Sequence, residues 1–362
     1  MKKTNELYVG IDVHKKNWSV CIRTKELEHK TFHMESDAEV LHGYLQKNFK
    51  SFSVTCGYEA CCMGFWIQKK LVEYGYKCLV LNPADIPGSD KEEKRKSDNS
   101  DCRKIARELS NEHMEGIFIP SEEQIAFRSV FRKRNSIVKN LRRIKSNIRS
   151  QLLFIGVHVP EEYEHNSWNL KFQQWLKDLE FEQSMSKVTL DCHLRELNFL
   201  HQEFLFLEKE LRAYARKYYK RDYERLRTVP GIGPLVSISL LAELGDIRRF
   251  RRVEELNSYI GLVPNIYQSA ATEINRGLTG RAKSLLRSYL IESSWIAARK
   301  DPEMMKYFSE RVKKMHPNKV MVKIARKLVN RVYYMLRYNR DYKINVNEEL
   351  IEVDRKTSAV RV

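Results

Sequence analysis

The spacing of apolar residues changes near residue 120, and this change constrains the fold more than any other feature of the chain. Before it, short apolar runs such as LYVGIDV, WSVCIRT, SFSVTCGYEA and YKCLVLNP are interspersed with stretches of helical spacing such as SDAEVLHGYLQKNF. The order strand, strand, strand, helix, strand, helix, strand, helix predicts an α/β sheet that starts with a meander. We therefore expect residues 1–118 to form one α/β domain.

Two long amphipathic patterns follow. In IVKNLRRIKSNIRSQLLFI and in LNFLHQEFLFLEKELRAYARKYY, large apolar side chains recur at intervals of three and four residues. This spacing is typical of helices with one buried face, and it predicts an antiparallel coiled-coil hairpin over residues 119–220. Residues 221–340 are expected to form a mostly helical third domain, and residues 341–362 a polar tail.

The charge of the chain is strongly positive. Lys and Arg number 65 and Asp and Glu number 47, which gives a net charge of +18. Such an excess favours a polyanionic partner, most simply nucleic acid, although a merely basic protein is the alternative. The seven cysteines form no metal-binding spacing, and no apolar signal core or membrane-length apolar stretch is present. These features predict a cytoplasmic protein with no membrane partner.

Four acidic residues stand out in the first domain. Asp12 lies within an apolar strand, where an ionised carboxylate is costly. Glu59 ends another strand, and Asp98 and Asp101 share one face of a helix. Taken singly, each has an ordinary structural interpretation. Asp12 would face a turn, Glu59 would be a solvated strand end, and the pair of aspartates would suit the first turn of a helix. Together, at the ends of two strands and on a nearby helix of one α/β unit, they would repel one another, which predicts a site for Mg²⁺ or Mn²⁺.

The basic residues are concentrated in one run. Between Gln124 and Pro160 the chain has nine Lys or Arg residues and no acid. A solvated helix face usually mixes both signs, so this run is interpreted as a surface for the phosphate backbone of nucleic acid. The predicted contacts are Arg132, Lys133, Arg134, Lys139, Arg142, Arg143, Lys145 and Arg149.

Two further motifs lie in the third domain. RLRTVPGIGPLVSISLLAEL has the form of a helix-hairpin-helix, in which Gly231 and Gly233 would let the backbone approach a phosphate; an ordinary turn between helices is the alternative. Ser269 lies in a small polar loop, where composition alone indicates a turn residue, and no hydrolase triad is indicated around it.

The segments YVGIDVHKKNWSV, GYEA, KSDNSDCRKIA, VPGIGPLVSISLLAEL and YIGLVPNIYQSA, in this order, resemble the DEDD-type transposases of bacterial insertion sequences. The resemblance covers roughly residues 5–340. It implies a RuvC/RNase H-like N-terminal domain, a coiled-coil middle and a C-terminal transposase domain with a catalytic serine. It also implies guidance by a structured bridge RNA, action on the ends of the element and on target DNA, and a homo-oligomer between dimer and tetramer.

The resemblance also assigns roles by position. Asp12, Glu59, Asp98 and Asp101 match the four metal-binding acids of the family, and Ser269 matches the serine that attacks DNA. Arg287 falls where the family has an arginine, and it is predicted to contact nucleic acid. The chain departs from the family pattern at two places: Ala270 replaces a glycine after the serine, and Thr279, Gly280, Arg281 and Ala282 replace Thr-Lys-x-Gly.

The function predicted from the sequence is therefore that of an insertion-sequence transposase that cuts and rejoins DNA through a serine nucleophile and metal-binding acids, guided by RNA. One alternative is a RuvC-type metal-dependent nuclease that acts on branched DNA by water attack, which needs the four acids but not Ser269. Another is a nucleic-acid-binding protein without catalytic activity.

Overall fold

A computed structural model of the chain describes residues 5–87, 98–112, 114–164, 168–269, 272–280 and 282–342. The side chains of residues 98–99, 265–269 and 272–276 lie outside this description. The chain divides into two compact units, residues 1–119 and 120–362, and each is described by itself. No helix within the described residues is both long and apolar enough to cross a membrane.

The first unit is a mixed α/β sheet, as the order of apolar runs predicts. Its five strands have the spatial order β3-β2-β1-β4-β5. The three-stranded meander β1-β2-β3 is antiparallel, whereas β4 runs parallel to both β1 and β5. The elements of this unit are β1 (Glu6–Val13), β2 (Asn17–Arg23), β3 (Glu28–Glu35), α1 (Ala38–Asn48), β4 (Ser53–Glu59), α2 (Trp66–Glu73), β5 (Lys77–Leu81), the short helix η1 (Pro83–Asp85) and α4 (Asp98–Ser110).

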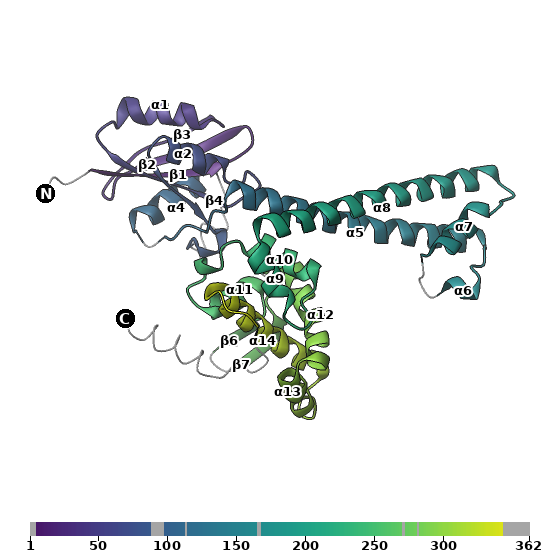
Figure 1. Ribbon diagram of the computed structural model, residues 1–362. Coiled ribbons are helices and arrows are strands. Elements are labelled where there is room, and N and C mark those ends of the chain that lie inside the picture. Colours follow the sequence, from purple (N-terminus) through teal and green to yellow (C-terminus); the bar gives the residue numbers. More distant parts are fainter. Residues whose placement is uncertain are drawn as a thin grey trace. The chain divides into compact units, whose positions relative to one another are not determined.

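Helices cover the two faces of this sheet (Figure 1). Alternate residues of β1 point to opposite faces, as in any strand. On one face Leu7 and Ile11 pack in a cluster with Leu41 of α1 and Ile67 of α2. On the other face Tyr8 packs with apolar residues of α4. Both faces of β1 are therefore buried, which is why its sequence is an almost continuous apolar run.

The second unit begins with two long helices, α5 (Glu122–Ile155) and α8 (Ser184–Tyr218), which lie side by side (Figure 1). Ser121 caps α5 by accepting a hydrogen bond from the N–H of Gln124, and Gly156 ends it with φ of 79°. The apolar residues of the 3–4 pattern form the contact between the two helices. Those that are buried there are Ile137, Ile144, Ile148 and Leu152 of α5 and Leu190, Leu197 and Leu200 of α8.

Helices also dominate the rest of this unit, which contains one β-hairpin among its described residues. Its core includes Phe127 and Leu211 from the bases of α5 and α8, together with the later helices. The division of this unit at residue 220 therefore stays a prediction. The remaining elements are α6 (Glu161–Glu164), α7 (Leu170–Asp178), α9 (Lys220–Arg227), α10 (Pro234–Leu244), η2 (Ile247–Arg249), α11 (Val253–Ile260), β6 (Pro264–Ser269), β7 (Thr272–Leu278), α12 (Ser284–Lys300), α13 (Pro302–Val312) and α14 (Pro317–Arg337).

Candidate active site and nucleic-acid interface

Two of the predicted acids lie at the same edge of the sheet. β1 and β4 are parallel neighbours whose last registered pair is Ile11 with Tyr58. Asp12 and Glu59 each come one residue later, at the carboxyl ends of these strands. By the alternation of side chains, both point to the face that carries Gly10 and Gly57, which is the face covered by α4. The sheet therefore places these two carboxylates next to each other, as the sequence predicts.

Glycine allows α4 to approach this face closely. A Cβ atom on Gly10 would lie 2.1 Å from the carbonyl oxygen of Cys102 and 2.4 Å from the nitrogen of Ala106. Glu112 follows the C-terminal end of α4. It accepts a hydrogen bond at 3.2 Å from Tyr8, which lies near the start of β1. The first turn of α4, which contains Asp101, therefore lies toward the carboxyl end of β1, where Asp12 is.

The charges at this edge affect neighbouring thiols. Burial raises the pKa of Cys102 to about 12, and the negative charge of Asp12 contributes to this rise. Burial also raises the pKa of Cys61, and Asp12 and Glu59 add to the increase. These two effects show that Asp12 is close both to α4 and to the segment that follows Glu59.

His14 is a neighbour of this site that sequence reasoning missed. Its Nε2 lies 3.1 Å from Oδ2 of Asp12, and the Asp12 side chain is 21% exposed. A weak signal for it is its position: His14 lies only two residues after Asp12 and therefore points to the same side of the chain if the strand continues. An imidazole in this place can orient the carboxylate.

Among the described side chains, no group of three or more His, Cys, Asp or Glu residues is arranged to hold a metal ion. Asp98 begins α4, but its side chain is outside the described residues. What the structure brings together is thus Asp12, Glu59 and the helical turn that carries Asp98 and Asp101. The chemistry of these donors fits a hard divalent cation, because carboxylate oxygens are its usual ligands.

Ser269 is the last residue of β6 and pairs with Thr272 of β7. Its side chain and residues 270–271 are outside the described part of the chain. Arg287 of α12 supports the base of this hairpin: its Nη1 donates to the carbonyl of Thr279 at 2.7 Å and to that of Gly261 at 3.1 Å. Arg287 therefore has a structural role in addition to the nucleic-acid contact predicted for it.

Comparisons with known proteins decide the family. Residues 9–156 match the DEDD_Tnp_IS110 family, described as "Transposase", and residues 223–309 match the "Transposase IS116/IS110/IS902 family". The chain belongs to this family of insertion-sequence transposases. It is thus a DNA-cutting and DNA-rejoining enzyme with a RuvC-like DEDD domain, and that domain implies dependence on a divalent metal.

Curated relatives agree with this assignment. A putative transposase of Sinorhizobium fredii is 26% identical over 295 residues, which is 80% of this chain and 71% of the relative. The transposase for the insertion sequence element IS1533 of Leptospira borgpetersenii is 23% identical over 297 residues, covering 80% and 85% of the two chains. A pilin gene-inverting protein of Moraxella lacunata is 23% identical over 358 residues, covering 96% and 100%.

The predicted basic surface of the transposase divides into two groups. Four of its cations have partners inside the second unit. Arg134 is buried and pairs with Glu208 at 2.7 Å, and Arg132 binds both oxygens of Glu243 at 2.9 Å. Lys145 and Arg149 lie over the ring of Trp168. The other four are exposed along α5: Lys133, Lys139, Arg142 and Arg143. For all eight, contact with a phosphate backbone stays a prediction.

The two glycines of the predicted helix-hairpin-helix differ in their surroundings. Gly231 has φ of 90°, and a Cβ atom on it would lie 2.2 Å from the carbonyl oxygen of Ser293 in α12. Internal packing alone therefore requires glycine at this position. Gly233 caps α10, and a Cβ atom there would meet nothing within 4 Å. Of the two, Gly233 has the open surroundings that contact with a phosphate needs.

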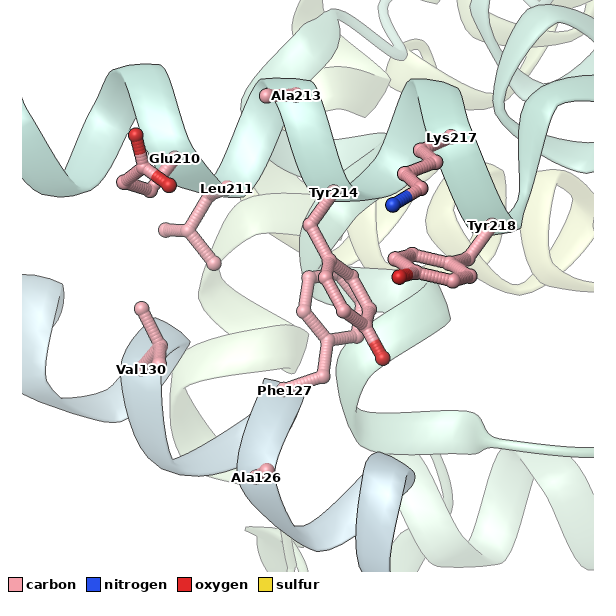
Figure 2. Close-up of a pocket in the computed structure, with 9 residues that line it drawn as sticks. All are labelled: Ala126, Phe127, Val130, Glu210, Leu211, Ala213, Tyr214, Lys217 and Tyr218. Atoms are coloured by element: carbon pink, nitrogen blue, oxygen red, sulfur yellow. The ribbon is translucent and has the colours of Figure 1, made fainter.

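A groove of about 400 Å³ lies between the bases of α5 and α8 (Figure 2). The rings of Phe127 and Tyr214 stack at 4.8 Å between centroids, and the exposed ring of Tyr218 lies beside Tyr214 at 4.5 Å. Lys217 extends over Tyr218 at its rim. The acid of its lining, Glu210, and the amine, Lys217, lie two turns apart on α8, so the groove offers no adjacent acid and base for catalysis.

Proposed function

We propose that this transposase cuts and rejoins DNA through a covalent bond to Ser269, assisted by a divalent cation at Asp12, Glu59, Asp98 and Asp101, and that a structured RNA guides it. The observation that carries the proposal is the placement of Asp12 and Glu59 on neighbouring parallel strands beneath the first turn of α4. In this proposal the RuvC-like domain is followed by a coiled-coil hairpin and by a C-terminal transposase domain with a helix-hairpin-helix.

The donors at the sheet edge suit Mg²⁺ or Mn²⁺. Asp12 and Glu59 are close enough to act on the same thiol, and two unneutralised carboxylates in such proximity repel each other. A cation bound there would neutralise them and stabilise the charge that develops on phosphate oxygens during strand cleavage. The residues of this chain that would hold it are the four acids, and His14 would orient Asp12.

In the proposed step, Oγ of Ser269 forms a bond to the phosphorus of a phosphodiester, and the bond from phosphorus to one sugar oxygen breaks. The serine hydroxyl loses its proton to the surroundings, and the released sugar oxygen gains one. The phosphoserine ester keeps the phosphate activated, so that the hydroxyl of another strand can displace the serine. Strands are thereby exchanged without an external source of energy.

The nucleic-acid surface supports the same proposal. Lys133, Lys139, Arg142 and Arg143 are exposed on one helix and have the sign needed to hold a phosphate backbone. Contacts of this kind give affinity without reading sequence. A base-pairing guide RNA would supply the missing sequence recognition, and a homo-oligomer would bring two element ends together.

Covalent joining tests this function. Labelled DNA that carries the element end is incubated with protein and Mg²⁺, with and without RNA transcribed from the flanks of the element, and separated in denaturing detergent. We expect a covalent protein–DNA product from the wild type that needs the RNA. The Ser269→Ala and Asp12→Asn variants, and chelation of the metal, should each abolish it. Ser258→Ala, a change of an exposed serine of α11 in the same unit, should not.

Two outcomes would replace the proposal. Cleavage of branched DNA by Ser269→Ala at the wild-type rate, with no covalent product from either protein, would show that water is the nucleophile and would favour the RuvC-type nuclease. A covalent product whose yield is the same with and without RNA would remove the guide role while leaving the serine chemistry in place.

A further inference from the structure

Four cations lie near the C-terminal end of α10, and two of them, Arg128 and Arg132, contact a buried carboxylate there. Arg128 and Arg132 come from α5, Arg249 from η2, and Lys283 from the residue that precedes α12. The carboxylate is that of Glu243, whose side chain is only 7% exposed. This cluster lies entirely within the second unit, and sequence reasoning identified only Arg132 among its members.

Each of the three arginines has a structural reason to be there. Arg132 binds both carboxylate oxygens of Glu243. Arg128 donates to the carbonyls of Ala242 and Glu243 at 3.1 and 3.3 Å. Arg249 donates to the carbonyl of Leu244 at 3.0 Å. Cations are stabilised at a helix C-terminus by its unpaired carbonyls and its dipole, so the arginines complete the end of α10.

Lys283 has no such reason. Within the part of the chain that the structure describes, its amine makes neither a hydrogen bond nor an ion pair. It lies 5.6 Å from the ring centroid of Tyr259, whose hydroxyl donates to the carbonyl of Glu243 at 3.1 Å. Burial lowers the pKa of Lys283. The attraction of Glu243 opposes this effect, but the charges of Arg132, Arg128 and Arg249 lower the pKa further. The lysine therefore costs the free protein electrostatic energy.

The cluster carries four positive charges, and the Glu243 carboxylate is already held by Arg132 on both oxygens. Asp246, whose negative charge acts on Arg249, pairs with Arg248. An additional anion is what these charges would stabilise. Arg132 is 52% exposed despite its pairing with Glu243, so an anion in solvent can reach the cluster. Lys283 is also the last residue of the segment that connects β7 to α12. Arg287 binds the start of this segment through the carbonyl of Thr279.

We propose that Lys283, with Arg132, binds a backbone phosphate of the DNA substrate beside the base of the β6–β7 hairpin. This inference rests on the proposed function, because it takes the hairpin of Ser269 to be the part that works on DNA. The site positions the strand and does not take part in bond breaking. A lysine retained at an electrostatic cost in the free protein gains its favourable partner only when DNA is bound.

The experiment compares stability and binding in the full-length protein. Lys283→Met removes the charge but keeps an unbranched side chain. We expect its thermal midpoint without DNA to equal or exceed that of the wild type. We expect the slope of log affinity against log salt, measured with duplex DNA of the element end, to fall by about 0.9, as for one lost phosphate contact. Lys283→Arg should retain the slope.

Two matched variants serve as controls. Lys300→Met makes the same charge change on an exposed residue at the other end of α12, and its slope should equal that of the wild type. Arg128→Met removes a cation that caps α10 and should lower the thermal midpoint.

The proposal would be overturned if Lys283→Met failed to fold, or if its thermal midpoint fell as much as that of Arg128→Met. Either result would show that the lysine is structural. An unchanged slope with DNA, or a slope that falls only with an RNA of the same sequence, would also overturn it. A third outcome separates the two proposals. If the wild type forms no covalent adduct between Ser269 and DNA, but the salt slope of Lys283→Met falls as expected, the proposed function alone is rejected.

Discussion

Gly10 shows how one residue positions the candidate site. It lies two residues before Asp12 on the same face of β1, and its hydrogen atom occupies the space that any side chain would take from the backbone of α4. The helix carries Asp98 and Asp101 in its first turn. The distance between these acids and Asp12 is therefore set by a residue that has no functional group of its own.

Gly10→Ala should consequently separate α4 from β1. Because the new Cβ would meet backbone atoms at 2.1 and 2.4 Å, we expect a loss of at least about 1–3 kcal/mol in the free energy of unfolding, measured with urea, and loss of metal-dependent cleavage. Gly43→Ala is the matched control: in α1 its Cβ would meet nothing within 4 Å, so the change should stabilise by about 1 kcal/mol. Equal stability of Gly10→Ala and the wild type would refute this role.

Among the elements, α13 and α14 are joined by a buried carboxylate. Asp301 caps α13 by accepting hydrogen bonds from the N–H groups of Glu303 and Met304 at 2.9 and 3.3 Å. It also pairs with Arg331 of α14 at 2.6 Å and accepts a hydrogen bond from Tyr342. Burial alone would raise the pKa of Asp301, but the bonds from Tyr342 and the charge of Arg331 outweigh it, and the pKa lies below its ordinary value of 3.8.

This lowered pKa predicts how stability depends on pH. A carboxylate with a lower pKa in the folded state stabilises the protein above its unfolded pKa and loses that contribution as pH falls through the folded value. We expect Asp301→Asn to lower the free energy of unfolding by about 3–5 kcal/mol at neutral pH, with a smaller difference below about pH 4. Asp246→Asn, at an exposed cap that pairs with Arg248, should cost no more than about 1 kcal/mol at either pH. A difference for Asp301→Asn that does not change with pH would contradict the assignment.

At the scale of the whole molecule, the proposed chemistry uses two compact units. Asp12 belongs to residues 1–119 and Ser269 to residues 120–362. The serine oxygen must come within about 3–3.5 Å of the phosphorus that is polarised by the metal. We predict that the two units of different protomers meet in an oligomer with DNA, so that each site is composite.

Mixing two inactive variants tests this arrangement. An Asp12→Ala protein and a Ser269→Ala protein should each give no covalent DNA product alone, because each lacks one half of every site. Combined before DNA is added, they should regain part of the wild-type yield, through sites built from one intact half of each. Failure to complement, together with wild-type activity in a strictly monomeric complex, would show that one chain builds its own site.

The order of strands and helices in the first unit and the shared edge of Asp12 and Glu59 were predictable, because both follow from the local period of apolar residues and from strand direction. The distribution of the cations was not. Arg134 pairs with Glu208 and Arg132 pairs with Glu243, at separations of 74 and 111 residues along the chain. No local sequence pattern predicts pairs so far apart. The surroundings of Lys283 were unpredictable for the same reason.

The parallel pairing of β1 with β4 under α4 also bears on synthesis. β1 leaves the ribosome first, yet its neighbour in the sheet, β4, and the helix that covers the face of Asp12, α4, come later in the chain. Contacts between distant segments form slowly, because the intervening chain must first be closed into a loop. A nascent chain therefore lacks the acidic edge until α4 has emerged. A truncated translation product that ends before α4 would be unable to cut the DNA that encodes it.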